Sequence, residues 1–124
     1  MMGPADYIEI AQLLARYCHI VDNKEWDRLT EIFTGDGSMS VPGRYEPHEG
    51  AEALRVLYAE KMNHPVAHNS TSLIVLEHNG DRARVASKWV TVRADGASGS
   101  GVYTDELVRT SDGWRIKSRV AVPA

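Results

Sequence analysis

Residues 66–122 read VAHNSTSLIVLEHNGDRARVASKWVTVRADGASGSGVYTDELVRTSDGWRIKSRVAV, and this stretch decides the fold. It contains four runs with strand-like apolar spacing, at about residues 66–77, 82–93, 98–109 and 114–122. The sequences HNGD, ADG and SDG separate these runs, and such short glycine-containing turns join antiparallel strands. We therefore predict a four-stranded meander. Its strands exceed the usual length of about five or six residues, so they should twist and curve.

The chain before this stretch has helical spacing instead. Apolar residues recur at intervals of three and four over residues 7–21 and 25–33, and in a third segment from Pro47 to Met62. Asp6 and Glu9 have the spacing of a capping box for the first helix, and a short strand is expected at residues 38–42. The sequence thus predicts one α+β domain, residues 1–124, with three N-terminal helices in the concave face of a curved sheet. A conical cavity should remain near the helix ends.

Composition narrows the function classes. The 124 residues have a net charge of −3 and no clustered Lys/Arg, so neither nucleic acid nor an anionic membrane is an expected partner. No apolar run approaches a membrane span, and the N-terminus lacks the layout of a secretory signal, which favours a cytoplasmic location. His64 and His68 are four residues apart, but Pro65 interrupts any helix that would align them. We therefore expect neither a metal nor a cofactor.

Three residues are candidates for chemistry. Tyr17 and Asp22 lie on the first helix and at its exit, and His68 lies near the start of the first long strand. Each has a structural alternative. Asp22 with Glu25 fits a second capping box, His68 fits the polar side of an alternating strand, and Tyr17 fits a core aromatic. Cys18 lies on the apolar side of the first helix, where a thiol is usually buried and inert.

The chain resembles the SnoaL-like branch of the nuclear transport factor two-like superfamily. The resemblance rests on RYCHIVDNKEWDRLTEIF (residues 16–33), on the strand that opens with His68, and on the terminal hairpin ELVRTSDGWRI (residues 106–116). It implies a cone-shaped α+β barrel with a strongly curved mixed sheet. The superfamily includes scytalone dehydratase, bile-acid dehydratase, polyketide cyclases and the small subunits of ring-hydroxylating dioxygenases, so the fold does not specify the activity.

The resemblance changes the interpretation of the candidate residues. In similar dehydratases an Asp at the exit of the first helix and a His on the strand after the third helix form a catalytic pair, and Asp22 and His68 occupy those positions. Tyr17 matches a pocket tyrosine. A carboxylate that orients an imidazole leaves the second ring nitrogen free as a base. The reverse assignment, with Asp22 as the base and His68 as the proton donor, stays open.

Two classes of function follow. The first is a cofactor-independent lyase or isomerase acting on a small, mostly apolar, oxygenated ring compound. The second is a non-catalytic module that binds a hydrophobic ligand, or the small structural subunit of a dioxygenase. Apolar residues on both alternations of residues 82–93 predict self-association, as a homodimer or otherwise a homotrimer.

Overall fold

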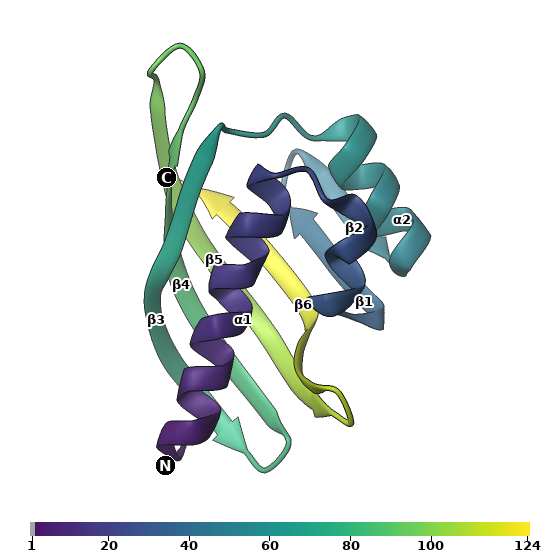
Figure 1. Cartoon of the computed structure of the whole chain (residues 1–124), viewed down its shortest axis with the longest axis vertical. Helices are drawn as coiled ribbons and strands as arrows, with labels where there is room; N and C mark the ends of the chain where they lie inside the picture. Colours follow the sequence, from purple (N-terminus) through teal and green to yellow (C-terminus); the bar gives the residue numbers. More distant parts are fainter. Residues whose placement is uncertain (1) are drawn as a thin grey trace.

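The computed structural model describes residues 2–124 and has the expected α+β architecture (Figure 1). The helical elements are α1 (Pro4–Asp22), the 3₁₀ helix η1 (Trp26–Glu31), and α2 (Ala51–Val56), which continues as one π-helical turn, η2 (Leu57–Lys61). The strands are β1 (Phe33–Val41), β2 (Tyr45–Glu49), β3 (Ala67–Asn79), β4 (Arg82–Val92), β5 (Ser98–Thr110) and β6 (Gly113–Pro123). The four predicted long strands correspond to β3–β6, so the predicted meander is confirmed.

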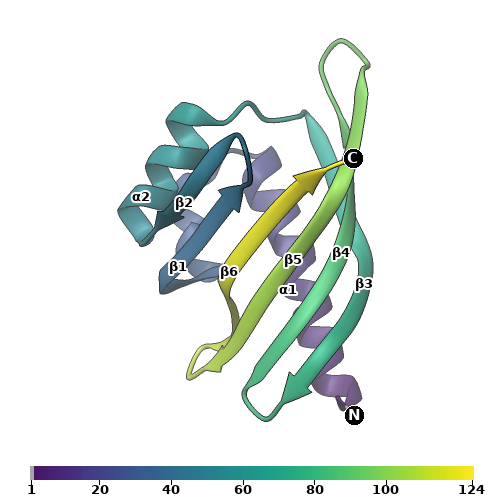
Figure 2. The same ribbon diagram turned by 180° about the vertical axis from the view of Figure 1, so that it is seen from behind.

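The six strands form one mixed sheet in the order β2-β1-β6-β5-β4-β3. All neighbouring strands are antiparallel except β1 and β6, which run parallel. The predicted curved mixed sheet is therefore confirmed, but it stays open because β2 and β3 remain edge strands and do not pair with each other. The curved sheet therefore forms only part of a barrel, and the helices cover its open, concave side (Figures 1 and 2).

Helix α1 lies across the concave face of the sheet and supplies much of the core (Figure 1). Its buried residues recur at helical spacing, which is what an amphipathic helix requires to bury one face; they are Ile10, Leu13, Leu14, Tyr17, Cys18, Ile20 and Val21. From the sheet, inward-facing residues such as Val85, Leu107 and Ile116 meet this face. The last turn of α1 consequently ends beside the start of β3, where His68 lies.

The predicted capping box at Asp6 and Glu9 was wrong. Helix α1 begins at Pro4 with Gly3 as its N-cap residue, and no side chain caps it. Asp6 instead accepts hydrogen bonds from the Arg109 guanidinium (2.7 Å) and the Trp114 indole (3.1 Å), and Glu9 accepts one from the Trp114 backbone N–H. These carboxylates fix the first turns of α1 to the β5–β6 hairpin. Because their partners are distant in the sequence, the spacing of Asp6 and Glu9 could not predict these contacts.

The segment between α1 and β3 differs most from the prediction. The second helix is only the 3₁₀ turn Trp26–Glu31, and the strand predicted at residues 38–42 already begins at Phe33. The TGDG sequence (residues 34–37) lies inside β1, where its pairing with β6 shifts register, so its two glycines accommodate an irregular strand. Gly37 fits closely, since a Cβ there would lie 2.9 Å from the Phe33 Cβ.

The third helix starts at Ala51, not at Pro47. Pro47 lies in β2, a strand absent from the prediction. Because β2 is an edge strand, a residue without an N–H is tolerated there. Gly50, with φ of 98°, then turns the chain from β2 into α2, a conformation that favours glycine.

Candidate active site

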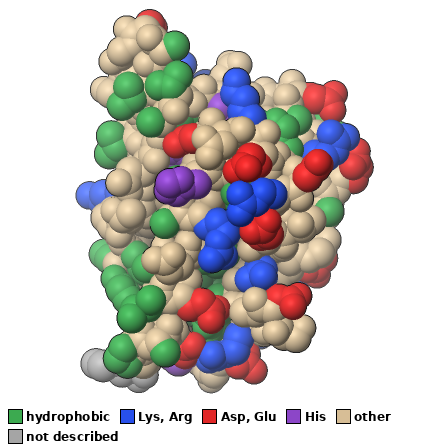
Figure 3. All heavy atoms as spheres, in the orientation of Figure 1, with side chains coloured by type: hydrophobic (Ala, Val, Ile, Leu, Met, Phe, Trp, Pro, Cys, Tyr) green, Lys and Arg blue, Asp and Glu red, His purple; other side chains and the backbone are tan. Residues whose placement is uncertain are grey.

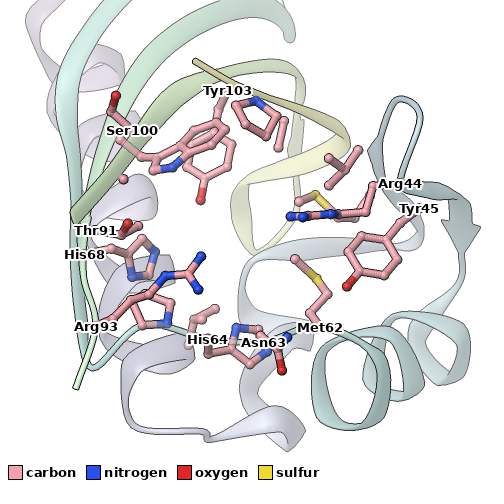
Figure 4. Close-up of a pocket in the computed structure, with 18 of the residues that line it drawn as sticks. Arg44, Tyr45, Met62, Asn63, His64, His68, Thr91, Arg93, Ser100 and Tyr103 are labelled. Atoms are coloured by element: carbon pink, nitrogen blue, oxygen red, sulfur yellow. The ribbon is translucent and has the colours of Figure 1, made fainter. Parts of the chain in front are cut away.

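A cavity of about 340 Å³ lies between the concave face of the sheet, the end of α1 and the segment that joins η2 to β3 (Figure 4). Its walls combine apolar side chains such as Met39, Val41 and Trp89 with the polar groups of Tyr17 and His68. The cavity that the sequence predicts near the helix ends is therefore present. Tyr17 and His68, two of the three predicted site residues, line it.

Asp22 and His68 form the hydrogen bond that the catalytic hypothesis requires. The His68 Nδ1–H donates to Asp22 Oδ1 at 2.6 Å, and the His68 backbone N–H donates to Asp22 Oδ2 at 3.0 Å. Both side chains are largely buried, with 3% of the His68 side chain and 19% of the Asp22 side chain exposed. Asp22 thus binds β3 with both carboxylate oxygens. The alternative role of Asp22, as the cap of the second helix, is not supported, because no side chain caps η1. It lies behind His68 and does not itself line the cavity.

This bond fixes the tautomer of His68. A carboxylate can only accept, so Nδ1 holds the hydrogen and Nε2 of the neutral ring remains an acceptor. Burial by itself lowers the pKa of His68, but hydrogen bonds and charge from Cys18 and Asp22 outweigh burial and raise that pKa above its ordinary value of 6.5. The ring is therefore poised to accept a proton near neutral pH.

Cys18 lies beside this pair. Its Sγ is 3.4 Å from the Ser70 Oγ. Burial raises the pKa of Cys18, whereas His68 and Ser70 lower it more, so its pKa lies below the ordinary value. Cys18 therefore contributes to the environment of His68, which the sequence did not suggest.

Tyr17 is fully buried, and its hydroxyl is 2.7 Å from the hydroxyl of Tyr58. The Tyr17 ring meets the His68 ring edge-on, with centroids 5.8 Å apart. Burial is the main cause that raises the pKa of both phenols, so each stays protonated at neutral pH. In such a pair one hydroxyl donates to the other, which leaves one O–H free to donate elsewhere.

A buried ion pair supports Tyr17 from the sheet. Arg119 on β6 donates to both carboxylate oxygens of Asp105 on β5, at 2.8 and 2.9 Å, and neither side chain is exposed. The Arg119 guanidinium lies between two rings, 4.2 Å from the Tyr17 centroid and 3.8 Å from that of Tyr103. Sequence reasoning missed this group. Counting back from the SDG turn along both strands would have placed Asp105 opposite Ser118, and only the register shift between Glu106 and Leu107 brings it opposite Arg119.

His64, which the sequence analysis considered only as half of a metal pair with His68, is a second histidine at the cavity. Its Nε2–H donates to the Tyr58 carbonyl at 2.6 Å, so Nδ1 is the acceptor nitrogen. The ring stacks on Tyr58 with an interplanar angle of 7°, and its centroid lies 4.8 Å from that of the Trp26 ring. Burial lowers the pKa of His64 below 6.5, which keeps the ring neutral.

Within residues 2–124, no group of three or more His, Cys, Asp or Glu side chains is arranged to hold a metal ion. In the same range, no helix is long and apolar enough to cross a bilayer.

Comparisons with known proteins agree with the architecture. The model of the SnoaL-like domain family matches residues 5–120, and the chain belongs to this family. The resemblance drawn from the sequence is thereby confirmed. Reactions differ among proteins of one fold, so the activity has to be argued from the site.

Individual similar proteins match the chain over nearly its whole length. The uncharacterized protein Rv2910c of Mycobacterium tuberculosis is 31% identical over 130 residues, covering 94% of this chain and 84% of the relative. The structure of a single-residue variant of Rv3472, a protein of unknown function from the same organism, is 28% identical with a TM-score of 0.83, covering 98% of this chain and 78% of that chain. A cystatin-like protein of unknown function from Nostoc punctiforme is 21% identical with a TM-score of 0.87, covering 99% and 94%.

Proposed function

We propose that the protein is a cofactor-independent lyase or isomerase of the dehydratase type, acting on a small, mostly apolar, oxygenated ring compound. The observation that carries this proposal is the His68 ring at the cavity wall, held from behind by the Asp22 carboxylate at 2.6 Å. A buried carboxylate in contact with an imidazole is an arrangement suited to general acid–base chemistry.

In the proposed reaction, His68 Nε2 removes a proton from a carbon next to a carbonyl or a leaving group. Asp22 keeps the hydrogen on Nδ1 and stabilises the imidazolium as it forms. The reverse assignment, with Asp22 as the base, receives less support because both carboxylate oxygens accept hydrogen bonds from His68 and Asp22 lies outside the cavity lining. The protonated His68 can then return the proton to the leaving group or to another carbon.

The phenol pair has a second role in this proposal. When Tyr58 donates to Tyr17, the Tyr17 O–H is free to donate into the cavity that Tyr17 lines. A donor there stabilises negative charge that develops on a substrate oxygen, and it does so more strongly in a buried site than in water. Arg119 stacks against the Tyr17 ring and fixes the position of this donor.

An assay that does not require knowledge of the natural substrate tests the proposal. Cyclic ketones and β-hydroxy ketones are incubated with the protein in D₂O, and NMR monitors exchange at the carbon next to the carbonyl, together with loss of water. We expect His68→Ala to abolish exchange. We expect Asp22→Asn to lower the rate by about 10²- to 10⁴-fold while ligand binding is retained, because the amide can hold the wrong tautomer.

His19→Ala, on the exposed side of α1, is the matched control and should leave the rate unchanged. Exchange that survives His68→Ala would contradict the catalytic assignment. Ligand binding without exchange or turnover across the panel would favour the alternative function, a non-catalytic module for hydrophobic ligands. Purification with a large iron-containing partner would instead favour a dioxygenase subunit.

A further inference from the structure

The cavity has an unusual charge for an acidic protein. Although the chain has a net charge of −3, the described residues that line the cavity include two arginines and two histidines but no aspartate or glutamate. The arginines are Arg44 and Arg93, and the histidines are His64 and His68. Because His64 is held neutral and His68 acts as a neutral base, the two arginines supply the positive charge at the cavity, while the molecule as a whole is anionic.

Arg44 and Arg93 reach the cavity from opposite walls. Arg44 ends the turn between β1 and β2, after Gly43, and Arg93 follows directly on the last residue of β4. Both guanidinium groups point into the cavity in Figure 4. Both residues are exposed at the mouth of the cavity, where water screens their mutual repulsion, and an anion between them would be attracted by both.

No carboxylate of the described chain supplies that anion. The side chains of Arg44 and Arg93 have no hydrogen bond or ion pair with any residue in the range 2–124, whereas Arg28 and Arg109, although exposed, each bond a carboxylate. Asp22, the acidic residue next to the cavity, uses both oxygens on His68. The two guanidinium groups are thus free to bind a ligand.

We infer that the substrate bears an oxyanion, most simply a carboxylate, which Arg44 and Arg93 hold at the mouth of the cavity. A guanidinium presents parallel N–H donors that match the two oxygens of such a group, so two of them can bind it from both sides. The apolar body of the ligand then lies against Met39 and Trp89, with its reacting carbon near His68. This inference rests on the proposed function for the identity of the reacting end.

Paired ligands that differ only in charge test this inference. The dissociation constants of 2-naphthoate and of the neutral 2-naphthamide are measured by calorimetry at low and high salt. We expect the acid to bind the unmodified protein at least tenfold more tightly than the amide, and salt to weaken only the acid. A parallel titration with 2-naphthyl phosphate identifies the preferred oxyanion.

Variants then assign the preference to the two arginines. Arg44→Gln and Arg93→Gln should each weaken naphthoate binding by about three- to tenfold, and the double variant should remove the preference over the amide. Arg82→Gln, at the far end of β4, is the control and should change neither affinity. The inference is overturned if the acid and amide bind equally, if neither saturates by millimolar concentration, or if the preference survives in the double variant.

The outcome is separable from that of the proposed function. If naphthoate binding depends on both arginines but no compound undergoes exchange or elimination, the proposed function fails and the anion site stands. If a ketone that bears a carboxylate is turned over at the same rate by the unmodified protein and by the Arg44→Gln/Arg93→Gln variant, the anion site fails and the proposed function stands.

Discussion

At the scale of single residues, two histidines four positions apart experience opposite environments. His64 donates to a backbone carbonyl and stacks between aromatic rings, and burial lowers its pKa below 6.5. For His68 burial also lowers the pKa, but Cys18 and Asp22 raise it more, and the net shift is above 6.5. The difference arises from the partners of each ring, because Cys18 and the Asp22 carboxylate raise the pKa of His68, whereas His64 bonds a backbone carbonyl.

This difference predicts the order in which the two rings titrate. In an NMR titration, His64 should protonate below pH 6.5 and His68 above it, and Asp22→Asn should lower the pKa of His68 while leaving His64 nearly unchanged. A reversed order would show that Asp22 does not stabilise the His68 imidazolium.

The raised pKa of His68 also makes the stability of the folded protein depend on pH in a defined direction. Because the folded protein binds this proton more tightly than the unfolded chain, the contribution is fully present below about pH 6.5 and is lost as the pH rises through the folded-state value. His64 has the opposite sign, so its contribution is lost as the pH falls through its own lowered pKa. A rate that depends on neutral His68 should fall as the pH drops through the raised value.

The buried pair of Arg119 and Asp105 gives a prediction about stability. Asp105→Asn should lower the free energy of unfolding by about 3–5 kcal/mol, because the guanidinium stays charged and loses its counter-ion in a buried site. Arg84→Gln removes exposed ion pairs with Glu77 and Glu106 and should leave the free energy of unfolding nearly unchanged. Urea denaturation measures both variants. Equal small losses would mean that Asp105 does not compensate Arg119.

At the scale of elements, the sequence pattern predicted those helices and strands whose formation depends on neighbouring residues in the chain. The apolar alternation and turns of β3–β6 and the apolar stripe of α1 each occur within a continuous stretch of sequence. The predictions of the meander and of the first helix were therefore correct. The short strand β2 was missed because its five residues, YEPHE, contain a proline and no apolar alternation. Its pairing with β1 makes it a strand, and pairing between segments cannot be read from one window of sequence.

Gly101 on strand β5 tests how tightly the strand packs against the Trp89 side chain, which lines the cavity. Gly101 lies opposite Trp89 in the ladder, and a Cβ there would overlap the Trp89 indole and the Val122 carbonyl. We expect Gly101→Ala to lower the free energy of unfolding by about 1–3 kcal/mol and to push the indole toward the cavity. Gly35→Ala, where no atom lies within 4 Å of the added carbon, is the control. Unchanged stability in Gly101→Ala would show that the indole relaxes freely.

At the scale of the whole molecule, the site combines segments that are far apart in the sequence. Tyr17 and Asp22 come from α1, His68 from β3 and Arg119 from β6, and the fold brings them together. The pairing of Asp22 with His68 was predictable because the family resemblance supplied a contact that spacing alone left open. Arg44, Arg93 and His64 were not predicted as cavity residues, because their place depends on the path of the segments on either side of α2.

The outer face of the sheet is the largest surface that the helices leave uncovered (Figure 2). Strand register places five exposed apolar residues on it, namely Ile74, Val90, Val92, Val102 and Val122, which are 38–63% exposed. The apolar surface continues along the edge where β3 lies, while charged side chains gather over the helices (Figure 3). Such a patch is typical of a protein interface.

We propose that a second copy of the chain covers this face and forms a homodimer, with a homotrimer as the next arrangement. A two-fold axis brings identical apolar patches together, so the face needs no other partner. Sedimentation equilibrium at micromolar concentration should show the dimer, and Val90→Glu with Val102→Glu should produce a folded monomer, because each substitution places a charged group in an apolar interface. Ile8→Glu, at an equally exposed apolar position on α1, should leave the mass unchanged. A monomer before any substitution would exclude the interface.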